Sequence, residues 1–276
     1  MELLFSFLQV LLLSFIELIY LVGSIIAVGL ILGFLERYSN SYLVRAFGPR
    51  GVLVTAWIGT PIHEIGHLIQ CFLWGHRVTR VKLLQLNSPN GVLGFVEHQY
   101  NRNSMYQQVG NFFIGIGPIF SGIGSLILGM YLFVPQSFKT FQEQFHQHVS
   151  LEKLDINVIK SIVGAIFAIS KSLFTLENFI NPLFWIFLAI AISISSHIAL
   201  SKADIQGSAK GLMMMFFLLV LFILAAGLLQ IDSYRLIVKF AEYNAYVLAF
   251  SGIAFLFSLF TLVLSYILYQ IKNYSK

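Results

Sequence analysis

Three residues in the first third of the chain have the spacing of a metal site. His63, Glu64 and His67 form the pattern H-E-x-x-H. On a helix, residues four apart lie on the same face, so both imidazoles can reach one ion while Glu64 lies beside it. Zn²⁺ binds histidine nitrogens at about 2.0–2.1 Å, and a neighbouring carboxylate can serve as general base. The pattern therefore predicts a hydrolytic zinc site with Glu64 as its catalytic base.

The motif lies in an apolar stretch, residues 51–74. An ionisable side chain at the centre of a bilayer costs about 2.5–3.5 kcal/mol on insertion scales, so it seldom persists there without a function. The hydrophobic fraction of the chain is 58%, and 11% of its residues are charged, whereas soluble domains contain roughly 25% charged residues. The composition therefore predicts an integral membrane protein with a metal site inside the membrane.

The charge and the cysteine content exclude several other kinds of site. The net charge of +5 is small and scattered, so it does not indicate nucleic-acid binding, and in a membrane protein it more often reflects basic residues in cytoplasmic loops. Cys71 is the single cysteine, which excludes an internal disulfide and a cysteine-based metal cluster. The first apolar stretch continues to Phe34 without a basic n-region, which predicts a retained transmembrane helix.

The elements that must position the motif are mostly apolar helices. A helix of about 20 apolar residues can cross a bilayer. Six apolar stretches meet this description, at residues 3–35, 51–74, 105–134, 182–200, 212–229 and 246–269. The shorter stretch 158–174 contains two lysines, which favours an interfacial or short span.

Two β-prone runs, 77–86 and 92–97, flank an Asn-Gly turn between the second and third stretches, and this is a hairpin pattern. The predicted fold class is an all-α polytopic integral membrane protein with about six transmembrane helices and a short membrane-associated β-hairpin.

Two histidines leave a catalytic zinc one protein ligand short of the usual three. Asp204 is one of three aspartates and follows the fourth apolar stretch, where we expect a helix to end before Gly207. His197 lies seven residues earlier, two helical turns away, so it would share a face with Asp204 if the helix continued. Asp204 could instead pair with Lys202 or Lys210. On the residues alone, both Asp204 and His197 stay open as the third ligand.

Together these features resemble the site-2 protease family, whose members are zinc metallopeptidases that cut within or beside membrane helices. The resemblance covers about residues 51–210 and rests on the motif helix, the hairpin, a span containing glycine and proline, and a late aspartate followed shortly by glycine. It implies that His63, His67 and Asp204 bind zinc and that Glu64 activates water. Family members usually have glycine directly after the aspartate, whereas two residues intervene here.

The resemblance also implies a division of the chain and a substrate. Residues 1–50 would form an N-terminal transmembrane helix and its connecting loop, 51–210 the metallopeptidase core, and 211–276 two C-terminal transmembrane helices. The protein would lie in the cell membrane as a multi-pass protein and hydrolyse peptide bonds of a membrane protein or peptide. The hairpin edge near 78–86 would hold the substrate extended by strand addition, and the likeness favours a cytoplasmic hairpin.

Two other functions stay open at this point. A different membrane zinc hydrolase could use the same ligands on another substrate, such as a short peptide or a remnant signal sequence. A transporter or scaffold could retain a structural metal, although metal binding alone does not require a base such as Glu64. The sequence does not indicate an oligomeric state.

Overall fold

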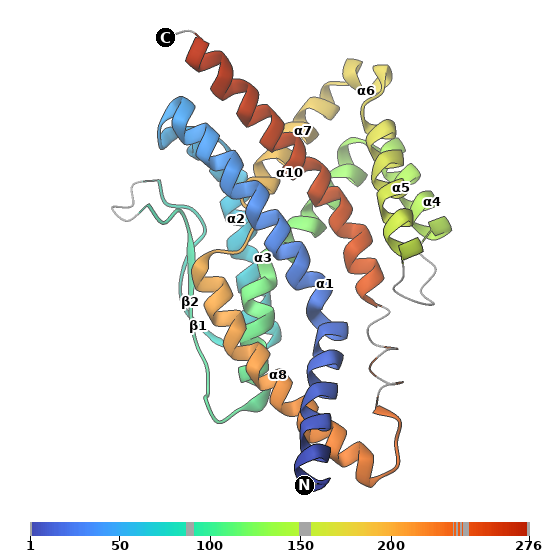
Figure 1. Ribbon diagram of the computed structural model, residues 1–276. Coiled ribbons are helices and arrows are strands. Elements are labelled where there is room, and N and C mark those ends of the chain that lie inside the picture. The colour runs from blue at the N-terminus through green and yellow to red at the C-terminus, as the bar shows by residue number, and fades with distance from the viewer. Residues whose placement is uncertain are drawn as a thin grey trace.

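The chain is mostly helical, with a small antiparallel sheet beside the helices (Figure 1). The computed structural model describes residues 2–86, 91–148, 156–233, 235, 237, 239 and 243–274. In chain order the elements are α1 (Glu2–Phe47), α2 (Arg50–Leu73), β1 (Arg77–Lys82), β2 (Phe95–Gln99), α3 (Met105–Phe133), α4 (Pro135–His148), α5 (Ile156–Leu173), α6 (Leu176–Ile180), α7 (Pro182–Ser195), α8 (Lys202–Leu228) and α10 (Tyr243–Tyr274).

Four of the described helices are long and apolar enough to cross a membrane, which indicates a membrane protein. They are α3, α8, α1 from Phe7 and α10 from Phe250. The predicted number of six spans is not confirmed, because α7 has only 14 residues and the motif helix α2 is not among the four. The outward face of α2 nevertheless exposes large apolar side chains, Val54, Trp57 and Phe72.

The first helix is longer than the sequence analysis predicted. The polar stretch 36–50 was expected to be a connecting loop, but α1 continues to Phe47. The helix ends at Gly48, which has a φ of +72° and donates its N–H to the carbonyl of Val44 at 2.8 Å. Glycine adopts this left-handed conformation without a Cβ penalty and commonly terminates helices. As a result, polar residues of α1 extend alongside the elements that carry the motif.

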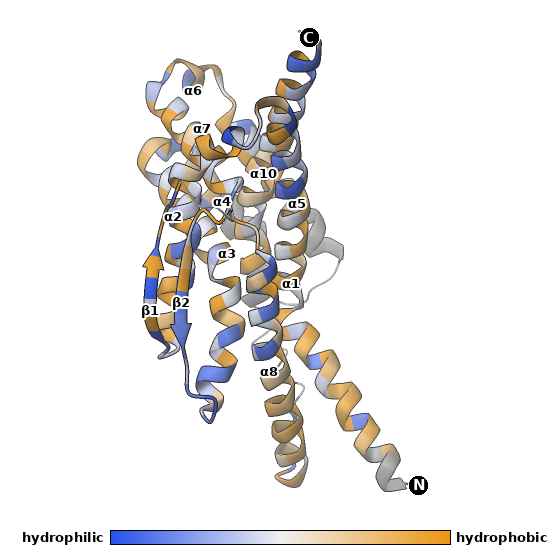
Figure 2. Cartoon of the chain, turned by 90° about the vertical axis from the view of Figure 1, so that its left-hand side faces the viewer, coloured by the Kyte–Doolittle hydropathy of each residue, from blue (hydrophilic) through white to orange (hydrophobic). Residues whose placement is uncertain are grey.

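The predicted hairpin is present. β1 and β2 pair antiparallel, with Arg77 opposite Gln99 and Lys82 opposite Phe95, and an irregularity interrupts the register after Val78. The Asn-Gly turn falls on residues 87–91, of which 87–90 lie outside the described residues. Figure 2 shows this hairpin along one side of the helices, with hydrophilic and hydrophobic residues mixed in β1 and a mostly hydrophilic β2.

Glycines let the motif helix approach its neighbours closely. A Cβ built on Gly66 of α2 would lie 2.6 Å from the backbone carbonyl carbon and oxygen of Gly117, and a Cβ on Gly117 would lie 2.6 Å from the carbonyl oxygen of Gly66. On the other side of α3, a Cβ on Gly115 would lie 2.6 Å from the carbonyl oxygen of Asp204. Small residues permit such backbone contacts between membrane helices, so α3 packs directly between α2 and the start of α8 (Figure 1).

Beyond these contacts, large apolar side chains fill the core between α1, α3, α7 and α10. The fully buried ones include Leu32, Phe112, Ile119, Phe187 and Phe257.

Candidate metal centre

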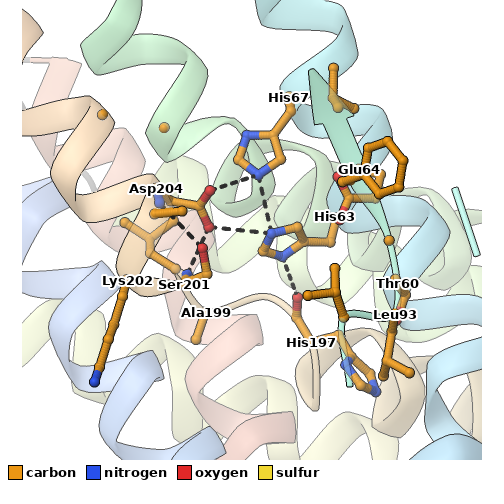
Figure 3. Close-up of a pocket in the computed structure, with 18 of the residues that line it drawn as sticks. Thr60, His63, Glu64, His67, Leu93, His197, Ala199, Ser201, Lys202 and Asp204 are labelled. Atoms are coloured by element: carbon orange, nitrogen blue, oxygen red, sulfur yellow. Dashed lines mark hydrogen bonds and ion pairs between the residues drawn. The ribbon is translucent and has the colours of Figure 1, made fainter. Parts of the chain in front are cut away.

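Three predicted ligands, from two helices distant in sequence, meet at one point (Figure 3). The Nε2 atoms of His63 and His67 are 3.2 Å apart. Asp204 directs Oδ1 to 3.1 Å from the His67 Nε2 and Oδ2 to 3.5 Å from the His63 Nε2. The three side chains form a group that could hold a metal ion.

The remaining ring nitrogens of the two histidines are bound to backbone carbonyls. The Nδ1–H of His63 donates to the carbonyl of His197, and the Nδ1–H of His67 donates to the carbonyl of Ile114, each at 2.7 Å. A carbonyl only accepts, so both neutral rings carry their hydrogen on Nδ1 and turn the lone pair of Nε2 towards the other ligands. This arrangement of outer hydrogen bonds is typical of metal-binding histidines, since it fixes the tautomer and the ring orientation.

The spacing of the donor atoms suits a small tetrahedral ion. Ligands that lie about 2.0–2.1 Å from a tetrahedral zinc are separated from each other by about 3.3 Å. The two histidine Nε2 atoms are 3.2 Å apart, close to that value, and the Asp204 carboxylate places Oδ1 3.1 Å from the His67 Nε2 and Oδ2 3.5 Å from the His63 Nε2. Without a cation, two lone pairs on facing Nε2 atoms and a carboxylate would lie together at low exposure, which is unfavourable. The donor set therefore fits a divalent cation.

Asp204 belongs to the start of a helix, not to the end of one as predicted from the sequence. It is the third residue of α8, where Ser201 is the N-cap. The Ser201 hydroxyl accepts from the Asp204 N–H at 3.2 Å, and Asp204 Oδ2 accepts from the Ser201 N–H at 2.7 Å. This reciprocal capping box fixes the carboxylate beside the histidines. The pattern Ser-x-x-Asp at 201–204 is the sequence signal for this helix start, and it did not enter the prediction.

His197 contributes its backbone to the centre, and its side chain points elsewhere. The helix does not continue from His197 to Asp204, because α7 ends at Ser195 and residues 196–201 are not helical. The Thr55 hydroxyl donates to the Val52 carbonyl at 3.0 Å, so the Nε2–H of His197 donates to the Thr55 oxygen at 3.0 Å. Its imidazole is therefore occupied outside the ligand group.

Glu64 lies beside the ligands in the wall of a cavity of about 880 Å³. Its side chain is buried, with 6% relative exposure. The segment before β2 passes directly over it: a Cβ on Gly94 would lie 2.7 Å from Glu64 Cγ and 2.8 Å from Thr60 Cγ2. A carboxylate beside the ligand group in the wall of the same cavity is placed to exchange a proton with a molecule bound there.

The hairpin contributes a different edge to the cavity than the one predicted. The cavity wall includes Gly91 to Val96 and His98 but no described residue of 77–86. Leu93 is held on its far side by Gln85, whose N–H donates to the Leu93 carbonyl at 2.7 Å. β1 therefore stands behind β2, and β2 with the segment before it faces the metal centre.

A pair of histidines supports this edge. The Nε2–H of His76 donates to the Gln107 carbonyl at 2.8 Å, so its Nδ1 accepts from the Nδ1–H of His98 at 2.9 Å. Burial lowers the pKa of His76. Burial, together with the neighbouring rings of His76 and His67, lowers the pKa of His98 to about 4. Both rings are therefore neutral at neutral pH and connect β2 to the end of α2 and to α3.

Two residues of α1 also line the cavity, Glu36 and Asn40. Neither was among the predicted site residues, since both lie in the stretch expected to be a loop outside the core 51–210. The candidate site thus draws on α1 as well as on α2, α3, the hairpin and the start of α8.

Comparison of the chain with protein-family models, with curated proteins and with solved structures gives no match.

Proposed function

We propose that the protein is a membrane-embedded zinc metalloprotease that hydrolyses peptide bonds of membrane-associated substrates. The observation that carries the proposal is the convergence of His63, His67 and Asp204 on one point, with the Nδ1–H of each histidine bound to a backbone carbonyl. Glu64 adds a general base, which a purely structural metal site does not need. The four apolar helices support a location in the cell membrane.

The roles of the residues follow from their positions. His63, His67 and Asp204 would hold zinc, which lowers the pKa of a bound water towards 7 and polarises the scissile carbonyl. Glu64 takes the proton from the attacking water and passes it to the leaving amine nitrogen as the peptide bond breaks. The capping box of Ser201 and the two backbone carbonyls keep the ligands in place during this transfer.

The substrate peptide would lie extended in the cavity beside β2. A helical segment hides its carbonyls in internal hydrogen bonds, so it must unwind before cleavage. β2 pairs on one edge with β1, and no second described strand covers its other edge. Strand addition at this edge would bring a peptide carbonyl past Gly94 towards Glu64.

The test is to measure zinc content and cleavage of a transmembrane reporter by the parent chain and by Glu64→Gln. The amide keeps the size of the side chain but cannot accept the proton. We expect both proteins to retain zinc and only the parent to cleave, with the rate of the variant lower by about 10²–10⁴-fold.

Other outcomes separate the rival functions. Zinc in both proteins without cleavage of peptide reporters by either would favour a scaffold or transporter with a structural metal. Cleavage confined to short peptides, and lost in Glu64→Gln, would favour a different membrane zinc hydrolase. A parent chain without bound metal would overturn the proposal.

A further inference from the structure

We infer that Glu36 of α1 is a positioning residue for the metal centre, because it fixes the non-helical segment 196–201 that leads to Asp204. The inference rests on the proposed metal centre and deepens it. It assigns a role to a half-buried carboxylate that lies outside the group His63, His67 and Asp204.

One face of α1 lies against this segment. Gly29, Gly33 and Glu36 follow at intervals of four and three, so they share a helix face. A Cβ on Gly29 would lie 3.4 Å from Leu200 Cδ1, and a Cβ on Gly33 would lie 3.9 Å from the Cβ of Ala199. These distances place both glycines next to the segment, and the Glu36 carboxylate lies one turn further along the same face.

Glu36 is the polar contact on this face. Its Oε2 accepts a hydrogen bond from the backbone N–H of Ala199 at 2.9 Å, across 163 residues of sequence. The segment is not helical, so the N–H of Ala199 has no partner within a helix and needs one from elsewhere. A hydrogen bond to an ionised or polar side-chain oxygen at low exposure is among the stronger ones that a backbone N–H can form.

Both ends of the segment contact the metal centre. Two residues before Ala199, the His197 carbonyl accepts from His63 Nδ1–H at 2.7 Å. Two residues after it, Ser201 begins the capping box that holds Asp204. A displacement of Ala199 would therefore move the outer partner of one ligand and the anchor of another. Outer partners of this kind typically change metal affinity by about 10–100-fold when they are removed.

Direct coordination by Glu36 does not explain its position. The group of side chains that could hold a metal consists of His63, His67 and Asp204 among the described residues. The Oε2 of Glu36 is already engaged by Ala199, and its Oε1 lies 3.5 Å from Asn40 Nδ2.

The experiment measures the zinc affinity of the purified full chain in detergent by competition with a chelator. Glu36→Gln keeps an oxygen that can accept the Ala199 N–H, so we expect an affinity within about threefold of the parent. Glu36→Asp keeps the charge but shortens the side chain, and Glu36→Met removes the acceptor at similar length. Both should bind zinc about 10–100-fold more weakly.

A matched control lies on the same helix. Glu17 is a second glutamate of α1 and is buried, about 28 Å away along the helix axis at 1.5 Å per residue. Glu17→Met should bind zinc like the parent. The circular dichroism of each variant without metal reports whether the helices are retained, and Glu36→Asp provides the test should Glu36→Met not fold.

Parent-like affinity in Glu36→Asp would overturn the inference. A loss in Glu36→Gln equal to that in Glu36→Asp would overturn it too, because it would show that charge and not the hydrogen bond to Ala199 matters. A parent chain that binds no zinc would instead overturn the proposed metal centre on which the inference rests.

Discussion

Each motif histidine uses one ring nitrogen for the candidate metal and the other for the protein backbone. His63 and His67 donate from Nδ1 to carbonyls and present Nε2 to the Asp204 carboxylate. This division distinguishes a ligand from its support. By its position Asp204 is a candidate ligand, whereas His197 supports His63 through its carbonyl and bonds Thr55 through its ring.

Substitution of Asp204 and of His197 should therefore have unequal effects. Asp204→Ala removes a ligand, and we expect zinc affinity to fall by more than about 100-fold, beyond the range typical of outer partners. His197→Ala leaves the carbonyl in place and should weaken zinc binding by less than about tenfold. Isothermal titration or chelator competition on both variants measures the difference. Equal losses, or a larger loss for His197→Ala, would contradict the ligand set.

Gly94 is the residue at which the hairpin passes over the proposed base. A Cβ there would lie within 2.9 Å of Glu64 Oε1 and 2.8 Å of Thr60 Cγ2. We expect Gly94→Ala to displace the segment before β2 and to lower kcat/KM for a transmembrane reporter by about tenfold, the effect of about 1.4 kcal/mol. Zinc binding should be unchanged because the ligands lie on α2 and α8. Unchanged cleavage would show that this segment does not position the substrate.

At the scale of elements, the contact between α2 and α3 holds the motif helix in place. Gly117→Ala would put a Cβ 2.6 Å from backbone atoms of Gly66, whereas Gly124 on the same helix has no atom within 4 Å of an added Cβ. Overpacking typically costs about 1–3 kcal/mol, and replacing a helical glycine by alanine in open space gains up to about 1 kcal/mol.

Thermal unfolding in detergent should thus give a lower Tm for Gly117→Ala and an equal or higher Tm for Gly124→Ala. A parent-like Tm for Gly117→Ala would mean that the helices do not approach as closely as described.

The His76–His98 pair makes the attachment of β2 sensitive to pH. The pKa of His98 is lowered by burial and its neighbours to about 4, and that of His76 is lowered by burial, whereas an unfolded histidine has a pKa of about 6.5. Between these values the unfolded chain binds more protons than the folded one, so the free energy of unfolding falls as the pH drops from 6.5 to 4.

His98→Asn should make this decline shallower, since Asn keeps a donor near the position of Nδ1 and does not titrate. Measuring Tm of the parent and of His98→Asn between pH 6.5 and 4 tests this prediction. Parallel curves would show that His98 does not contribute.

The sequence was informative about elements wherever a local pattern determined them. Alternation around an Asn-Gly turn predicted the hairpin, and apolar length predicted α3, α8 and α10. It was less informative where a boundary depended on a single cap. Ser201 caps the start of α8 six residues after α7 ends, so Asp204 lies at the start of a helix. Gly48 ends α1 twelve residues after the composition becomes polar at residue 36.

At the scale of the whole molecule, the candidate site is assembled from segments that periodicity cannot relate to one another. The spacing of His63 and His67 is local, so a sequence motif reveals it. The approach of Glu36 to Ala199 depends on how α1 packs against the segment between α7 and α8, and nothing within either segment encodes that contact. The same reasoning explains why the sequence did not show that β2 and the segment before it, and not β1, line the cavity.

X-ray absorption at the zinc edge of the purified full chain tests the metal centre most directly. We predict one bound zinc whose spectrum fits two imidazole nitrogens at about 2.0–2.1 Å, with the remaining ligands oxygen and no sulfur. Loss of the bound metal in His63→Ala would identify the His63 imidazole as one of the two nitrogen ligands. A zinc with a sulfur ligand, which only Cys71 or a methionine could supply, or a chain that retains no zinc, would contradict the site formed by His63, His67 and Asp204.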